Sequence, residues 1–392
     1  MNKPWVTIIG LGEDGLPGLS DASRDVIAQA EVVFGGPRHL DLVGAGARGR
    51  AWPVPFDVAP VIALRGQAVV VLASGDPFWF GAGGSLTPHL AAGEWVAHPT
   101  PSTFSRAASV LGWRLETVAC HGLHAAPFAR LRPDLQDGVR LICLLRDAAA
   151  PGDLARWLCE MGFGASTVSV LERLGGKFQR VRSIAAQDYD LTDVLAPVTV
   201  AIEAEGSGLP RGFGLPDDVF AHDGQITKRS IRAMTLAALG PRPGEMLWDI
   251  GAGSGSVSIE WCLAGGQAVA VEAKPLRAAN IRVNAAAFGV DHRLSVLEST
   301  APAGLSGQPS PDAVFVGGGG DAALYAALLP MLRQGTRLVA NAVTLETEGV
   351  LVGLCATHGG TLTKIDIATA TPLGRMSGWT AARPVVQWSV VP

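Results

Sequence analysis

Short apolar runs alternate with stretches of helical spacing along this chain, and that alternation predicts parallel strands covered by helices. The apolar runs of the first half are residues 6–10, 32–34, 68–73, 141–145, 167–171 and 198–202. Those of the second half are residues 246–250, 268–271, 294–297, 313–316 and 337–340. The last two runs, 361–367 and 385–390, predict a closing hairpin, so the second half is expected to be one α/β sandwich with a mostly parallel sheet.

Three loops rich in glycine or in small polar residues follow strands in the first half. They are residues 10–15 (G-L-G-E-D-G), residues 74–77 (S-G-D-P) and residues 101–105 (P-S-T-F-S). The first has the G-x-G-x-x-G spacing, but Pro17 and Gly18 interrupt the helix that a dinucleotide fold would begin there. Ligands of open α/β sheets bind at the carboxyl ends of strands, so the three loops predict a cleft at that edge.

A stretch rich in glycine, proline and aspartate, residues 206–226, separates the two halves. We therefore expect a first domain at 1–205, a linker at 206–226 and a second domain at 227–392.

The richest signal in the second half is a glycine loop between a predicted strand and a predicted helix. Glycines stand at alternate positions, Gly251, Gly253 and Gly255, and the acid Glu272 ends the next apolar run about 20 residues later. Glycine lets the backbone turn sharply and lets a ligand approach its N–H groups. A carboxylate at that distance suits a ribose, whose two hydroxyls can both donate to it. The pattern predicts a nucleoside-binding βαβ unit.

The spacing favours S-adenosylmethionine (SAM) over a dinucleotide. Dinucleotide sites prefer G-x-G-x-x-G, whereas this loop reads G-x-G-x-G and follows an acid, Asp249. A carboxylate there would repel a pyrophosphate and pair with the cationic amino-acid group of SAM. An NAD(P)-dependent oxidoreductase is the competing class, and Asp249 and Pro17 speak against it.

Composition narrows the remaining classes. The 392 residues are 48% hydrophobic and 17% charged, which suits two or three packed domains and excludes disorder. A net charge of −4 without a long basic run argues against nucleic acid, and no apolar run is long enough for a membrane span. The five scattered cysteines, and a start that turns polar too early for a signal peptide, predict a cytoplasmic protein with reduced thiols. A metal site could be suspected at Cys120, His121 and His124. No further Cys or His cluster completes a coordination set, so this segment is predicted to be a turn with polar side chains.

Two further segments are candidates for substrate contact. Arg173, Lys177, Arg180 and Arg182 cluster between predicted strands, either as a solvated basic loop or as contacts to an anionic substrate. The four glycines of residues 317–320 follow a predicted parallel strand. Because they have no side chains, their backbone is predicted to form one wall of the substrate site.

The second half resembles the class I SAM-dependent methyltransferases, and within them the decarboxylating precorrin methyltransferases. The matching segments are HDGQITKRSIRA (222–233), LWDIGAGSGSVSIEW (247–261), VEAKPLRAANIRVNAAAFGV (271–290), DAVFVGGG (312–319) and ANAVTLE (340–346). The first half resembles the tetrapyrrole (corrin/porphyrin) methylases through VTIIGLGEDG (6–15), LASGDPFWFG (72–81) and PSTFS (101–105). Together the resemblances span nearly the whole chain.

These resemblances imply a tetrapyrrole-methylase fold of two α/β subdomains with a cleft, followed by a Rossmann-like class I methyltransferase sandwich. They imply two SAM-dependent C-methylations and one decarboxylation of a corrin-ring precursor of cobalamin, with two SAM sites, no resident metal and self-association of the chain. The implied SAM contacts are Thr227, Gly251, Ala252, Gly253, Ser254, Gly255, Glu272 and Ala301 in the second domain, and Leu11, Gly75, Asp76, Ser102 and Thr103 in the first. The candidates for holding the many substrate carboxylates or lining the substrate site are Arg173, Lys177, Arg180, Lys228, Arg229, Gly317, Gly318, Asn341, Arg375 and Arg383.

Two departures from the family patterns bear on these contacts. Leu123 stands where tetrapyrrole methylases often carry arginine, and Thr300 replaces an acid often found near the adenine. No catalytic acid or base is identified; Asn341 and Glu346 are the nearest candidates. Two readings stay open beside the double methylase: a single methyltransferase with one inactive half, and a non-catalytic protein that binds SAM or a tetrapyrrole.

Overall fold

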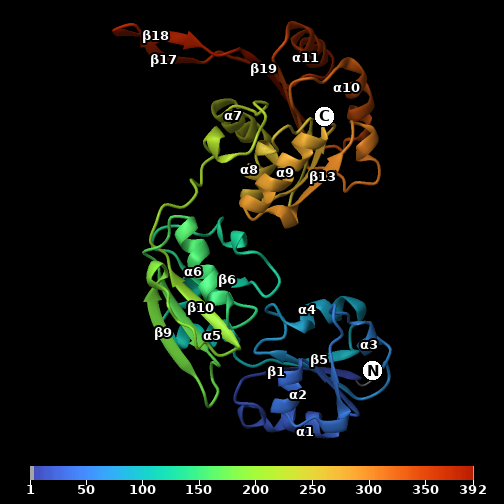
Figure 1. Ribbon diagram of the computed structural model, residues 1–392. Helices are drawn as coiled ribbons and strands as arrows, with labels where there is room; N and C mark the ends of the chain where they lie inside the picture. The colour runs from blue at the N-terminus through green and yellow to red at the C-terminus, as the bar shows by residue number, and fades with distance from the viewer. Residues whose placement is uncertain (1–3, 392) are drawn as a thin grey trace. The chain divides into compact units, whose positions relative to one another are not determined.

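The computed structural model describes residues 4–391, which form two compact units. The first comprises residues up to 128 together with 134–208, and the second comprises 129–133 together with 209 onward. Each is an α/β unit, and Figure 1 labels many of the elements of both.

The first unit begins with a five-stranded, all-parallel sheet in the order β3–β2–β4–β1–β5. Its strands are β1 (Val6–Leu11), β2 (Val32–Gly35), β3 (Gly49–Ala51), β4 (Val69–Ser74) and β5 (Trp95–His98). Its helices are α1 (Asp21–Gln29), α2 (Pro37–Leu42), α3 (Ala59–Ile62) and α4 (Ala82–Leu86). Because β1 lies between β4 and β5, the three predicted loops meet at one edge of this sheet, as the sequence indicated.

A second, mixed sheet of five strands completes the first unit in the order β6–β7–β10–β8–β9. Its strands are β6 (Val118–Gly122), β7 (Arg140–Leu144), β8 (Thr167–Glu172), β9 (Arg180–Ala185) and β10 (Val198–Glu203). Its helices are α5 (Thr103–Leu111), whose Phe104 and Ala107 pack on the sheet, and α6 (Ala150–Glu160).

Two predictions for this region were wrong. Cys120 and His121 belong to strand β6 and not to a turn, and the residues around them pair in parallel with β7. Arg180 and Arg182 lie on the edge strand β9 and not in a loop. The strand pairs antiparallel with β8, and both arginine side chains contact the buried carboxylate of Glu172 on that strand.

The second unit is a seven-stranded sheet in the order β13–β12–β11–β14–β15–β19–β16. Its strands are β11 (Met246–Ile250), β12 (Gln267–Glu272), β13 (Leu294–Glu298), β14 (Ala313–Val316), β15 (Arg337–Ala342), β16 (Thr361–Ile365) and β19 (Val385–Val390). Strands β11 to β15 pair in parallel, and β19 pairs antiparallel with β15 and β16. The predicted parallel sandwich is confirmed.

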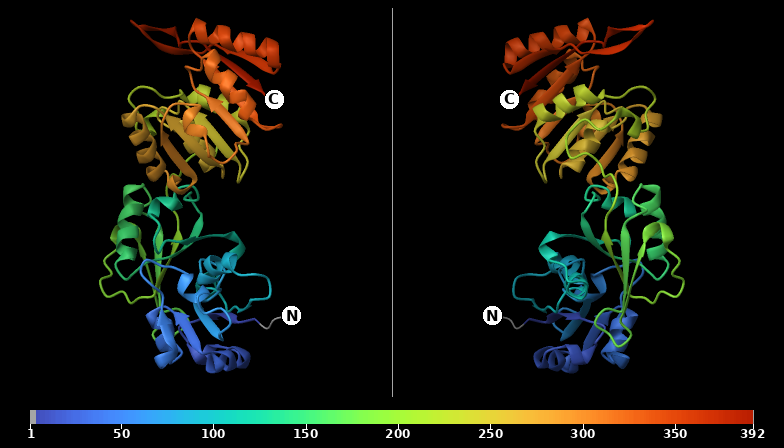
Figure 2. Two further views of the ribbon diagram at one scale, coloured as in Figure 1. Left: turned by 90° about the vertical axis from the view of Figure 1, so that its right-hand side faces the viewer. Right: turned by 90° about the vertical axis from the view of Figure 1, so that its left-hand side faces the viewer.

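Helices cover both faces of this sheet. Residues of successive strand positions point to opposite faces, so Leu247 packs with one set of helices and Trp248 with the other. The first set is α7 (Arg229–Leu239), α8 (Ser256–Leu263) and α9 (Pro275–Ala287), and the second is α10 (Ala322–Leu328) and α11 (Leu345–His358). Figure 2 shows the sheet between these layers.

The prediction that the last two strands pair with each other was correct, but the prediction that they are joined directly as a hairpin was wrong. Strands β16 and β19 are neighbours, but a separate two-stranded hairpin, β17 (Ala368–Leu373) and β18 (Met376–Ala381), is inserted between them. This hairpin extends away from the sandwich in Figure 1. Every helix within residues 4–391 falls short of the length and apolar character needed to cross a bilayer.

Candidate functional site

The glycine loop of the second unit joins β11 to α8 in a conformation that glycine favours. Gly251, Gly253 and Gly255 have φ angles of 70°, 59° and 72°. A Cβ at Gly255 would lie 2.7 Å from Cγ2 of Ile281, so α9 leaves no room for a side chain there. A Cβ at Gly251 would meet no atom within 4 Å, because that position faces open space. The loop is therefore packed on one side and open to a ligand on the other.

Glu272 supports this loop from the end of the neighbouring strand β12. Its Oε2 accepts a hydrogen bond of 2.9 Å from the N–H of Gly253, and its Oε1 accepts one of 2.9 Å from the N–H of Lys274. The side chain is only 5% exposed. Each carboxylate oxygen has a second lone pair, so the group can also accept two hydroxyl hydrogens from a ribose.

Asp249 lies near the end of β11, just before the glycine loop. Its side chain is buried, and Oδ2 accepts a 2.6 Å hydrogen bond from the hydroxyl of Ser258. Burial raises the pKa of Asp249 to about 6, and the bond from Ser258 opposes that rise. The residue is not among those that line the adjacent cavity. Its pairing with the amino-acid end of a ligand therefore stays a prediction.

A cavity of about 630 Å³ opens beside the loop and gathers most of the second-domain predictions. The predicted residues that line it are Thr227, Lys228, Arg229, Gly251, Ala252, Gly253, Gly317, Gly318, Asn341 and Arg383. The predicted residues outside the lining are Ser254, Gly255, Glu272, Ala301 and Arg375. Arg375 lies in the turn between β17 and β18, and Ser254 is buried with no hydrogen-bond partner for its hydroxyl within the described part of the chain.

Asn341 is fixed at this cavity by bonds at both ends of its amide. Its Nδ2 donates to the hydroxyl of Thr235 at 3.0 Å, and its Oδ1 accepts from Nε2 of Gln387 at 3.0 Å. All three side chains are buried. The amide is therefore a rigid part of the wall and has little freedom to move towards a substrate.

Arg277 lines the same cavity and was missed by the sequence reasoning. It lies in the first turn of α9, and its Nε donates to Asp223 at 2.8 Å. The only signal in the sequence was its position within the segment that follows Glu272. Lys228, Arg229, Arg277 and Arg383 together give the cavity four cationic side chains.

In the first unit, glycines allow the three predicted loops to pack backbone against backbone. A Cβ at Gly10 would lie 1.8 Å from the carbonyl oxygen of Gly75 and 2.8 Å from the nitrogen of Thr100. Gly75 has φ 60°, and its N–H donates to Leu11 at 3.0 Å. The loops after β1, β4 and β5 therefore form one surface.

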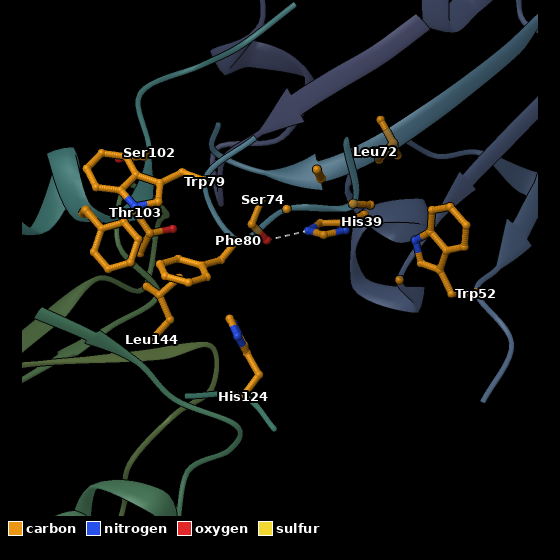
Figure 3. Close-up of a pocket in the computed structure, with 15 residues that line it drawn as sticks. His39, Trp52, Leu72, Ser74, Trp79, Phe80, Ser102, Thr103, His124 and Leu144 are labelled. Atoms are coloured by element: carbon orange, nitrogen blue, oxygen red, sulfur yellow. Dashed lines mark hydrogen bonds between the residues drawn. The ribbon is translucent and has the colours of Figure 1, made fainter. Parts of the chain in front are cut away.

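Two cavities of about 230 and 60 Å³ open on this surface. Leu11, Gly75 and Thr103 line the smaller one, and Ser102 and Thr103 line the larger one (Figure 3). Asp76 lines neither, and its Oδ1 accepts from the N–H of Phe78 at 2.8 Å. The larger cavity also has aromatic walls, made by Trp52, Trp79, Phe80 and Phe104.

The basic residues predicted to hold substrate in the first domain lie outside the lining of both cavities. Arg180 donates to the buried Glu172 at 2.7 Å and to Asp193 at 2.8 Å. The bonds to Asp193 from Arg180 and Arg182 lower the pKa of Asp193 to about 2. Arg173 donates to the carbonyl of Ala196, and Lys177 lies over the ring of Phe178. Their contact with substrate stays a prediction. Within residues 4–391 no cluster of three or more His, Cys, Asp or Glu side chains is placed to hold a metal ion.

Comparison with known proteins agrees with both halves of this description. Residues 6–188 match the family of tetrapyrrole (corrin/porphyrin) methylases, and residues 218–392 match the precorrin methyltransferase domain. A Sinorhizobium protein named precorrin-6Y C(5,15)-methyltransferase [decarboxylating] is 48% identical over 99% of this chain and 96% of its own length. A Mycobacterium tuberculosis protein of the same name is 37% identical over 98% of this chain and 99% of its own.

A solved structure of the C-terminal domain of the Rhodobacter capsulatus precorrin-6Y C5,15-methyltransferase is also similar. It is 57% identical, covers 46% of this chain and 98% of its own, and has a TM-score of 0.45. The full-length relatives decide the assignment, because their similarity runs through both units. The chain belongs to the family of decarboxylating precorrin-6Y C5,15-methyltransferases.

Proposed function

We propose that this chain methylates C5 and C15 of precorrin-6Y with SAM and removes the acetate carboxylate at C12 as CO2, which gives precorrin-8X in cobalamin biosynthesis. Family membership over the full length supports the overall reaction. The glycine loop braced by Glu272, beside a cavity of about 630 Å³, is the structural observation that carries it. We assign methylation at C5 to the first domain, and methylation at C15 with decarboxylation to the second.

Each domain is proposed to hold one SAM. In the second, Thr227, the loop from Gly251 to Gly255, Glu272 and Ala301 would hold it, with Glu272 on the ribose. In the first, the contacts would come from Leu11, Gly75, Asp76, Ser102 and Thr103. The open face at Gly251 and the unused lone pairs of Glu272 fit a nucleoside at the second site. When bound, SAM supplies a methyl group that is activated for displacement by its positive sulfur.

The chain's own contribution to methyl transfer is alignment and exclusion of water. A reduced tetrapyrrole carries enamine-like carbons that are already nucleophilic, so no strong base is needed to activate them. Loss of CO2 requires an electron sink, which the conjugated macrocycle of the substrate provides. The rigid amide of Asn341 and the bare backbone at Gly317 and Gly318 would form the wall against which the macrocycle is oriented.

The substrate carries many carboxylates, and the cationic side chains of the second cavity suit them. Lys228, Arg229 and Arg383 line it, and we propose that they bind acetate and propionate groups. Arg173, Lys177, Arg180 and Arg375 remain proposed contacts for the outer carboxylates.

We further propose domains at 1–205 and 227–392 with a linker at 206–226, a cytoplasmic location, and self-association. The five cysteines, all free, support a reducing compartment. Leu373, Met376 and Trp379 on the β17–β18 hairpin are 70%, 78% and 79% exposed, which supports burial against another copy. Sedimentation analysis of the chain tests this: a monomer at micromolar concentration would contradict it.

The experiment that tests the proposal is calorimetric titration of S-adenosylhomocysteine into the purified chain, and into halves split near residue 210. We expect two sites, one in each half. One site confined to the second half would favour the single methyltransferase with an inactive first half. Binding of NADH in place of S-adenosylhomocysteine would contradict the proposal.

A further inference from the structure

Ser74 ends strand β4 and lines both cavities of the first unit. Its Oγ lies 2.9 Å from Nε2 of His39, which comes from α2. Figure 3 shows the two side chains pointing towards one another at the cavity. A terminal nitrogen of Arg38 lies 2.9 Å from the same Nε2 and 3.2 Å from Oγ of Ser74. A hydroxyl, an imidazole and a guanidinium therefore form a closed triangle at the junction of the two cavities.

The guanidinium fixes where the protons of this triangle lie. Arginine can only donate, so Nε2 of His39 accepts from Arg38, and the proton of the neutral ring is on Nδ1. The hydroxyl of Ser74 lies at the same distance of 2.9 Å from Nε2, so it shares the single lone pair of that nitrogen with Arg38 and can donate its proton there. Burial and, after it, the charge of Arg38 lower the pKa of His39 to about 4, so the ring is neutral near pH 7. The hydroxyl oxygen of Ser74 can therefore accept a proton at the cavity while it passes its own proton to His39.

We propose that Ser74 and His39 form a proton relay that removes the hydrogen from the ring carbon methylated in the first domain. This inference rests on the proposed function and names the base that the reaction there requires. The carbon at a meso position carries one hydrogen, which must leave as a proton when a methyl group takes its place and the conjugation is restored.

The step balances without any further reactant. As the ring carbon bonds to the methyl group, the C–S bond breaks with its electron pair on sulfur, and the macrocycle takes one positive charge. The electron pair of the C–H bond then returns to the ring, and the proton passes to Oγ of Ser74. The hydroxyl proton of Ser74 passes to Nε2 of His39, which becomes an imidazolium.

The charges around the triangle favour rapid release of that proton. Arg38 contacts the ring directly, and Arg173 is a second positive charge that acts on Arg38. Glu13 is a negatively charged neighbour of the triangle, and it forms an ion pair with Arg38. His124 faces the same cavity with a pKa lowered by burial, so it adds no positive charge near pH 7. An imidazolium beside Arg38 is unfavourable, so His39 returns its proton to water and is reset for the next turnover.

The test uses the full chain with Ser74→Ala and His39→Gln. We expect each variant to slow methylation in the first domain at least tenfold, with affinity for S-adenosylhomocysteine at that site unchanged. Replacing the hydrogen of the methylated carbon by deuterium should slow the variants more than the wild type, because proton loss becomes rate-limiting. A residue with a purely structural role would not produce this isotope effect.

A second serine–histidine pair in the same unit provides the matched control. Oγ of Ser23 lies 3.0 Å from Nδ1 of His98, and neither residue lines the two cavities. His98→Gln should leave the rate of methylation unchanged. Turnover by His39→Gln at the wild-type rate, or without an enlarged isotope effect, would overturn the relay.

A readout independent of turnover separates this inference from the proposed function. Nitrogen NMR of the wild type should show His39 neutral at pH 7 with its proton on Nδ1, and Ser74→Ala should shift the Nε2 resonance. A protonated ring, or a proton on Nε2, would refute the relay even if methylation occurs. A wild-type chain that has these NMR properties and transfers no methyl group would refute the proposed function instead.

Discussion

Replacing Glu272 by glutamine should selectively weaken the SAM site of the second domain. The carboxylate accepts one backbone N–H on each oxygen, from Gly253 and from Lys274, each at 2.9 Å. Glutamine has the same shape but only one oxygen, so its NH2 group must face one of those N–H donors. One bond to the loop is lost, and so is one acceptor for a ribose hydroxyl.

The size of the effect follows from that count. A hydrogen bond to a charged group contributes about 1.5–3 kcal/mol. A change of about 1.4 kcal/mol alters a dissociation constant tenfold. Glu272→Gln should therefore raise the Kd for S-adenosylhomocysteine at the second-domain site about 10- to 100-fold. The site of the first domain should keep its affinity.

Isothermal titration calorimetry of the full chain measures both sites at once, and Glu298 offers a matched control. Glu298 is the direct neighbour of Glu272 on strand β13, but it is half-exposed and pairs with Arg282 at 2.6 Å. Glu298→Gln should leave both affinities within about twofold, as expected for a surface ion pair. A Kd for Glu272→Gln that equals that of the control would refute the role given to Glu272.

Three further predictions concern stability. Gly10→Ala would place a Cβ 1.8 Å from the carbonyl of Gly75, so urea unfolding should show a loss of about 1–3 kcal/mol, whereas Gly84→Ala, with no atom within 4 Å, should not destabilise. Glu260→Gln removes one of the two carboxylates that pair with the buried Arg232, leaving Asp217, and should cost about 1.5–3 kcal/mol; an unchanged melting temperature would contradict this. Asp193 has a pKa lowered from 3.8 to about 2 by bonds from Arg180 and Arg182, so its stabilisation is present above pH 3.8 and is lost as the pH falls towards 2. The difference in melting temperature between wild type and Asp193→Asn should shrink over that range, and a difference independent of pH would contradict the assignment.

The parts of the site that the sequence predicted well depend on local rules. The glycine loop and Glu272 belong to one strand–helix–strand unit, so their spacing alone places Glu272 beside the loop. The hydrogen bond from Gly253 to Glu272 confirms this position. The cleft at the end of β4, β1 and β5 follows from the general placement of ligands on parallel sheets. The family resemblances also supplied the fold of both halves, which the comparisons confirm.

The parts that were missed depend on contacts between distant segments. Arg180 and Arg182 appeared to form a basic loop because their partners, Glu172 and Asp193, lie 8 and 13 residues from Arg180. The inserted β17–β18 hairpin exposes large apolar side chains, so it lacked the buried alternation that marks a strand. The burial of Asp249 and its bond to Ser258 also cannot be read from spacing. Ser74 and His39 lie 35 residues apart, and only the folded sheet brings them together.

The most direct test of the central claim is mass spectrometry of the product that the full chain forms from precorrin-6Y and SAM with a deuterium-labelled methyl group. The proposed function predicts a product with two labelled methyl groups and one CO2 fewer than the substrate. A product with a single label, or one that keeps the acetate carboxylate, would contradict the claim that one chain performs both methylations and the decarboxylation.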